Sequence, residues 1–185
     1  MVLFHNHVLL SSYTVTFLQK ICMSYVNEFN SLTNLTALTI FKNKIATLPA
    51  TIFDHLTNLD YLDIGFNSIT TLAATIFDKL SILKTLFINN NSIATLPATI
   101  FDKLTNLENL FLYSNPWNCM DCNVKIIGQN PAYNNSKGTD YIAKCDGTGA
   151  DISIYAYDCT SPTTSPTSTE TTTATTDSTT TGTTE

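Results

Sequence analysis

Three consecutive segments occupy residues 32–55, 56–79 and 80–103, and they read LTNLTALTIFKNKIATLPATIFDH, LTNLDYLDIGFNSITTLAATIFDK and LSILKTLFINNNSIATLPATIFDK. A fourth copy begins at Leu104 and follows the same pattern as far as Asn115. Every copy places leucine at its first, fourth and seventh positions and asparagine at its twelfth. Self-similarity at a fixed period of this size is typical of stacked repeats. Residues 32–115 are therefore predicted to form a solenoid.

Each copy contains a short alternating stretch that predicts a strand. In the stretch 37–41, Leu38 and Ile40 point to one side of the strand and Thr39 points to the other. Successive strands should then stack into a parallel sheet over an apolar interior, where each buried side chain contributes about 1.5–3 kcal/mol. The interior positions of the first copy are Leu32, Leu35, Leu38, Ile40, Ile45 and Leu48.

Two other residue types recur with the same period. Asparagine stands where each copy leaves its strand, and its amide can satisfy backbone groups of adjacent turns. These residues are Asn43, Asn67, Asn91 and Asn115. On the return side, Phe53, Phe77 and Phe101 are predicted to stack as a second row, which Phe29 extends.

The segments 48–59 and 96–107, LPATIFDHLTNL and LPATIFDKLTNL, carry a family resemblance. They resemble extracellular leucine-rich repeat proteins of the 24-residue type, as in Toll-like receptors and variable lymphocyte receptors. The middle copy departs by having Ala73 in place of proline, which should loosen its turn slightly. The resemblance implies an α/β solenoid with a short parallel concave sheet, an irregular or helical-turn convex side, a disulfide-bonded C-terminal cap and a disordered tail.

Residues 1–31 fit the repeat poorly. The stretch Tyr13–Phe17 alternates like a strand, but its apolar residues lie one place out of register with the later copies. One interpretation is a degenerate first repeat or cap. A second is a secretion signal with an apolar core from Val8 to Leu18, and a third is a truncated gene model.

The outward strand positions differ between copies, whereas the return segments are almost identical. Six outward positions are aromatic, and exposed aromatic surface usually marks an interaction site. We expect the concave sheet to bind a ligand through aromatic anchors and two polar contacts. The alternative is that the N-terminal segment covers these rings or that the solenoid tolerates them. The anchors are Tyr61, Phe66, Phe87, Phe111 and Tyr113, and the polar contacts are Asp63 and Asn89.

Residues 116–159 contain four clustered cysteines, which indicate an oxidising compartment. The entry Asn115-Pro116-Trp117 resembles the C-terminal cysteine cap of extracellular leucine-rich repeat proteins. Spacing alone leaves three connectivities open. The resemblance implies the pairs Cys119–Cys145 and Cys122–Cys159, although two residues separate Cys119 from Cys122 where the family more often has one. A zinc site is the alternative, but the 13 residues between Cys145 and Cys159 are unlike the close pairs of most zinc sites.

Residues 160–185 consist of threonine, serine and proline at 21 of 26 positions, which predicts a disordered, O-glycosylated stalk. The resembled lymphocyte receptors have such a stalk before an apolar tail that directs lipid anchorage. No such tail follows here, so we expect a secreted protein or a record that is cut short. Glycosylation sequons begin at Asn34, Asn90 and Asn134.

Composition argues against several classes of function. The net charge is -6 and the nine lysines form no cluster, so nucleic acid is not an expected partner. No apolar run reaches the roughly 18 residues of a membrane span, and no motif predicts a catalytic site, a metal or a cofactor. We expect an extracellular, non-enzymatic module that binds a protein or glycan, in an immune-receptor-like or adhesion role. The alternative is a structural cell-surface or matrix protein without a specific ligand.

Overall fold

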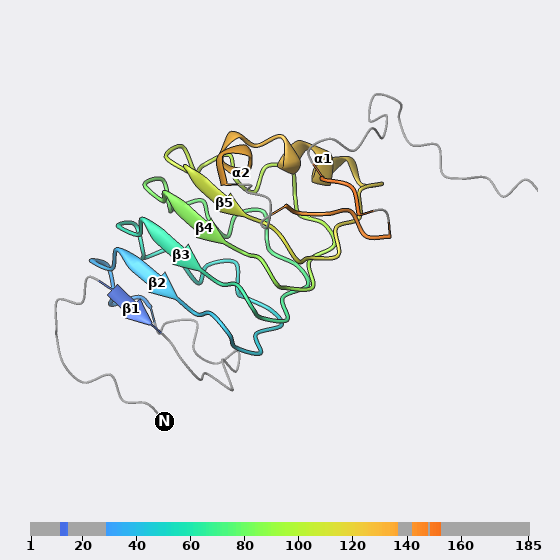
Figure 1. Cartoon of the computed structure of the whole chain (residues 1–185). Coiled ribbons are helices and arrows are strands. Elements are labelled where there is room, and N and C mark those ends of the chain that lie inside the picture. Colours follow the sequence, from blue (N-terminus) through green and yellow to red (C-terminus); the bar gives the residue numbers. More distant parts are fainter. Residues whose placement is uncertain (1–11, 15–28, 137–141, 148, 153–185) are drawn as a thin grey trace, which may run out of the picture.

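The computed structural model describes residues 12–14, 29–136, 142–147 and 149–152. Its centre is a five-stranded parallel sheet in which the strands follow one another in chain order (Figure 1). The strands are β1 (Ser12–Thr14), β2 (Ala37–Thr39), β3 (Tyr61–Asp63), β4 (Thr85–Phe87) and β5 (Asn109–Phe111). The predicted parallel sheet is therefore confirmed, and each strand is shorter than the five-residue stretch expected.

Backbone pairing between turns continues beyond the strand ends. The amide of Ile40 donates to the carbonyl of Asp63 at 2.8 Å, and the amide of Lys42 donates to the carbonyl of Gly65 at 3.2 Å. Lys42 then adopts a left-handed backbone with φ of 56°. The same conformation occurs at Phe66, Asn90 and Ser114. The chain thus turns away from the sheet at the same position of every repeat.

The register of the sheet follows the 24-residue period from β2 onward. Ala37 pairs with Tyr61, which pairs with Thr85. At the first strand, however, Tyr13 lies beside Leu38, a separation of 38 − 13 = 25 residues. One extra residue therefore accommodates the displaced pattern of the N-terminal segment. Whether residues 1–31 are a degenerate repeat or a signal stays a prediction, because residues 1–11 and 15–28 lie outside the described part.

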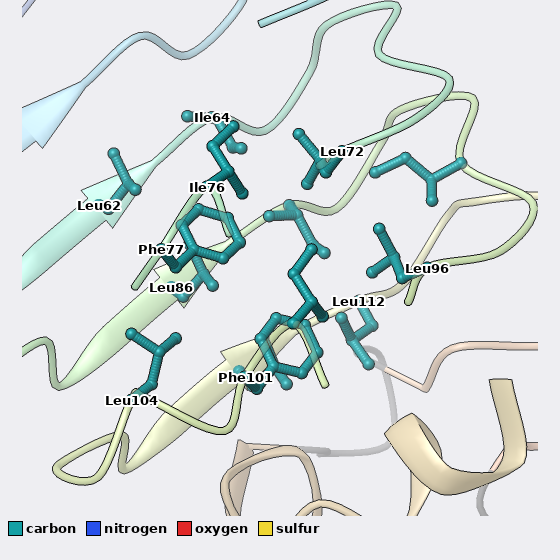
Figure 2. Packing of buried hydrophobic residues seen from close by; sticks show 14 of the residues in the cluster. Leu62, Ile64, Leu72, Ile76, Phe77, Leu86, Leu96, Phe101, Leu104 and Leu112 are labelled. Atoms are coloured by element: carbon teal, nitrogen blue, oxygen red, sulfur yellow. The ribbon is translucent and has the colours of Figure 1, made fainter. Parts of the chain in front are cut away.

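The interior contains the predicted leucine and isoleucine positions. Leu38, Leu62 and Leu86 are completely buried, whereas Leu32 is only partly buried at the N-terminal end. The rings of Phe53 and Phe77 stack with centroids 6.2 Å apart, and those of Phe77 and Phe101 at 6.3 Å. Figure 2 shows Phe77 and Phe101 among the leucines and isoleucines of neighbouring turns. The predicted phenylalanine row is confirmed, and Phe29 is buried in the same core.

The predicted asparagine ladder is also confirmed. The side-chain nitrogen of Asn91 donates to the carbonyls of Ile64 at 3.2 Å and Ile88 at 3.1 Å. Its side-chain oxygen accepts the amide of Ile69 at 3.0 Å. Asn67 and Asn115 make equivalent bonds one turn before and one turn after. Asn67, Asn91 and Asn115 therefore each connect two turns of the solenoid, and Asn43 donates to the carbonyls of Ile40 and Phe41 in its own turn.

The return side consists of hydrogen-bonded turns. The amide of Ile52 donates to the carbonyl of Pro49 at 3.1 Å, and that of Ile100 donates to Pro97 at the same distance. In the middle repeat, Ile76 donates to Ala73 at 3.2 Å. The turn therefore closes in the same way with alanine or proline at its first position.

The segment after β5 extends the core past the last strand. It contains α1 (Cys122–Gly128) and α2 (Pro131–Ser136), and α2 packs against β5 (Figure 1). Trp117 is fully buried, and its indole nitrogen donates to the carbonyl of Leu112 at 2.9 Å. In the described part of the chain, no helix is long and apolar enough to cross a membrane.

A disulfide joins Cys119 to Cys145 in this C-terminal segment, which is one of the two pairs that the family resemblance implies. Cys122 is also disulfide-bonded. Cys159 lies outside the described residues, so the pair Cys122–Cys159 stays a prediction. The same holds for the disordered stalk at 160–185, which lies outside the described part.

Candidate functional site

The face of the sheet opposite the apolar core carries a row of three aromatic rings, in which the middle ring contacts the other two. The centroids of Tyr61 and Phe87 are 5.7 Å apart, and their ring planes are inclined by 47°. Phe87 and Phe111 stack with centroids 4.1 Å apart and ring planes inclined by only 6°. All three side chains are partly exposed. We call Tyr61, Phe87 and Phe111 the aromatic face.

The period of the repeat explains why these rings meet. Residues at equivalent outward positions of successive strands lie side by side, because the strands pair in parallel with an offset of 24 residues. Phe87 and Phe111 are direct partners in the register of β4 and β5. The leucine between each pair of outward residues is buried, so the backbone that carries the rings is fixed by the core.

Phe66 lies apart from the aromatic face, at the rim where the chain leaves the sheet. Its ring is 38% exposed and contacts Phe41 edge to face, with centroids 4.7 Å apart. The ammonium of Lys42 lies 5.1 Å from the centre of the Phe41 ring and 5.7 Å from that of Phe66. A positive φ is unfavourable for a bulky side chain, so the conformation of Phe66 has a cost that burial in the core does not offset.

A shallow depression of about 530 Å³ lies beside this rim. It is lined by Lys42, Asn43, Phe66, Asn67, Asn90, Asn91 and Ser114. Sequence reasoning did not include Lys42 or Ser114 among the site residues. The sequence shows that Lys42 and Ser114 occupy equivalent positions just after their strands. It does not show that the backbone there is left-handed, which directs both side chains toward the depression.

Asp63 forms the polar centre next to the aromatic face. One of its carboxylate oxygens accepts the amide of Gly65 at 2.8 Å. Burial raises the pKa of this carboxyl above its ordinary value, and the bond from Gly65 opposes that shift. Burial also raises the pKa of the Tyr61 hydroxyl, and the nearby charge of Asp63 adds to the effect. The charge of Asp63 thus acts on the Tyr61 hydroxyl.

Asn89 is placed differently from the open polar contact that the sequence led us to expect. Its side chain is only 2% exposed, and its oxygen is buried without a hydrogen-bond partner. A methyl group on Gly65 would lie 3.0 Å from this oxygen and 3.1 Å from a carboxylate oxygen of Asp63. Gly65 therefore provides the space that both polar side chains occupy, a role that the sequence did not reveal.

The remaining expected site residues are spread over the surface. Tyr113 is partly exposed where the chain leaves β5. Asn34 is exposed, Asn90 lines the depression, and the side chain of Asn134 lies outside the described part, so all three glycosylation sites stay predictions. Within the described residues, no cluster of three or more histidine, cysteine, aspartate or glutamate side chains could hold a metal ion.

The family model for leucine rich repeats matches residues 57–116. The matched region contains β3, β4, β5 and most of the asparagine ladder, so the match and the geometry together support a leucine-rich repeat protein. Leucine-rich repeats are a protein-interaction fold, which is consistent with a chain that is not an enzyme. Among curated proteins, none matches the chain.

Proposed function

We propose that this protein is an extracellular recognition module that binds a protein ligand non-covalently on its concave face. The observation that carries the proposal is the stacked, partly exposed row of Tyr61, Phe87 and Phe111. The solenoid does not need aromatic residues at these positions, because the first repeat has Ala37 and Thr39 in the equivalent columns. Aromatic side chains supply much of the energy at protein interfaces.

Two features support an extracellular location. The disulfide between Cys119 and Cys145 is typical of proteins that fold in an oxidising compartment. The buried Trp117 and the nearby disulfide fit the entry and the paired cysteines of the C-terminal cap that the resemblance to extracellular leucine-rich repeat proteins implies. A role like that of an immune receptor or an adhesion protein fits this combination of solenoid, cap and threonine-rich tail.

The experiment is a binding screen combined with a glycan placed on the candidate surface. The full chain, secreted from animal cells, is tested against arrays of extracellular proteins and glycans. Phe111→Thr creates a sequon at Asn109 on the concave face, and Glu108→Thr creates one at Asn106, which is exposed beside the face. We expect saturable binding to a protein, its loss with the glycan at Asn109, and its retention with the glycan at Asn106.

Other results have distinct meanings. Binding that survives an occupied glycan at Asn109 would place the ligand elsewhere and refute the concave site. Saturable binding to a glycan alone would replace a protein ligand with a carbohydrate. Absence of saturable binding to any arrayed molecule would favour the structural surface or matrix protein.

A further inference from the structure

Asp63 is a partly buried carboxylate for which the described residues provide no cationic partner. Its carboxylate accepts a single bond, from the amide of Gly65, and no lysine or histidine of the described part forms an ion pair with it. A carboxylate can accept about four hydrogen bonds. The carboxylate can therefore accept further hydrogen bonds from a ligand, on the face where a ligand is expected to bind.

The surroundings of Asp63 add negative potential. The buried oxygen of Asn89 has no donor and points toward the same side of Gly65 as the carboxylate of Asp63. Both oxygens thus lie close to one point beside Gly65, at 3.0 Å and 3.1 Å from the position that a methyl group there would take, and among the described residues the amide of Gly65 donates to Asp63 alone. The Asn89 oxygen is fully buried and acts only through its partial negative charge. The Asp63 carboxylate is partly exposed, and because it is partly shielded from water it attracts a cation more strongly than it would on an open surface.

Aromatic rings flank the same place. Tyr61 and Asp63 lie two residues apart on the same outward face of β3, and Phe87 contacts Tyr61 while pairing with Asp63 in the sheet register. A cation that approaches the carboxylate would therefore also contact aromatic carbon, which is favourable for guanidinium and ammonium groups.

We propose that the concave face receives a basic side chain of its protein partner, whose guanidinium or ammonium group pairs with Asp63 beside Tyr61. The inference rests on the proposed function and specifies the chemistry of the ligand. A metal ion is a poor fit, because calcium and magnesium need about six or more oxygen ligands, whereas Asp63 and Asn89 offer two side chains and one charge. A flexible basic side chain needs no such shell and supplies several donors to one carboxylate.

The probe is an acetylated and amidated hexapeptide of alternating glycine and arginine, titrated into the isotopically labelled full chain and followed by NMR. The amide of Gly65 is the reporter, since it donates to Asp63. The control peptide has citrulline in place of arginine, which keeps the shape of the side chain and removes its charge. We expect the arginine peptide to shift the Gly65 amide saturably and to bind roughly tenfold more tightly than the citrulline peptide.

Asp63→Asn tests the carboxylate directly, because asparagine can still accept the Gly65 amide. Asp102→Asn is the matched control, since it makes the same change of charge at an exposed position of the return side. We expect Asp63→Asn to weaken binding of the arginine peptide roughly tenfold and Asp102→Asn by less than about twofold. Equal effects of the two variants would show that only net charge matters and would overturn the inference.

The citrulline comparison uses the unaltered protein, so it holds even if Asp63→Asn fails to fold. Equal affinity for the arginine and citrulline peptides would also overturn the inference. The proposed function is judged separately. If the glycan at Asn109 abolishes binding of a protein partner while the arginine peptide shows no preference, the concave face is the binding site and its ligand is not basic.

Discussion

Replacing Asn91 with alanine should remove a large part of the stability of the repeats. Its side chain bonds the carbonyls of Ile64, Ile88 and Asn89 and the amide of Ile69. The three carbonyls keep a second donor each, from Asn67, Asn115 and the amide of Phe66. The amide of Ile69, by contrast, donates to Asn91 alone among the described residues and would be left buried and unpaired.

The size of the effect follows from this difference. An unpaired buried amide costs about 1–3 kcal/mol, and each lost bond to a carbonyl that keeps another donor costs about 0.5 kcal/mol or less. The expected loss is therefore about 3 kcal/mol, which corresponds to a fall in Tm of roughly 10 °C for a folded unit of this size. Thermal and urea unfolding followed by circular dichroism measure it.

Asn58→Ala is the matched control. Asn58 is exposed, and its amide makes a single bond, to the carbonyl of Thr33 at 2.8 Å. Its loss should cost less than about 1 kcal/mol, since water can replace the missing donor. If Asn91→Ala and Asn58→Ala destabilised the chain equally, the ladder would not connect the turns in the way described.

Three further predictions concern stability. Ile82 stands where Asn58 and Asn106 each donate to the preceding turn, so Ile82→Asn should add a bond to the Thr57 carbonyl and gain about 0.5–1 kcal/mol in urea unfolding. Ala73→Pro should gain about 0.4–1 kcal/mol in the same assay, because the turn at Ala73 closes like those at Pro49 and Pro97 and proline restricts the unfolded chain; a loss of stability would show that the backbone at Ala73 differs. Asp63→Asn should stabilise the free protein at neutral pH, because a carboxyl whose folded pKa is raised contributes stability at pH below its unfolded pKa and loses it as pH rises through the folded pKa. The gain in urea midpoint should shrink on going from about pH 7 to about pH 3, and a gain that is constant with pH would contradict the assignment.

The repeated positions could be predicted because each has one physical task in every turn. Leu62 pairs with Leu38 and Leu86 in the sheet, Asn67 donates to a carbonyl of the preceding turn, and Phe77 stacks between the equivalent phenylalanines of the adjacent turns. Their types thus follow from burial, backbone pairing and ring stacking. The same comparison separated the outward residues, which do not repeat, and so identified Tyr61 and Phe87 as candidates.

The arrangement within the site was harder to predict. Aligning the repeats shows that Gly65 and Asn89 are equivalent residues of neighbouring turns. The alignment does not show that the side-chain amide of Asn89 is buried in the space left by the missing side chain of Gly65. Likewise, the left-handed backbone of Phe66 moves its ring from the sheet face to the rim. The burial of the Asn89 side chain and the position of the Phe66 ring both depend on the local backbone geometry at single residues. A repeating sequence pattern carries no information about such differences between the copies.

The concave face is tested most directly by the affinity of a protein partner for the double variant Phe87→Ala/Phe111→Ala. Thr75→Ala/Thr99→Ala, two exposed return-side positions, is the control. We predict that the first variant stays folded and raises the Kd at least about 30-fold, as expected for two aromatic anchors, while the control changes it less than about twofold. A folded double variant that keeps full affinity would contradict recognition on the concave face.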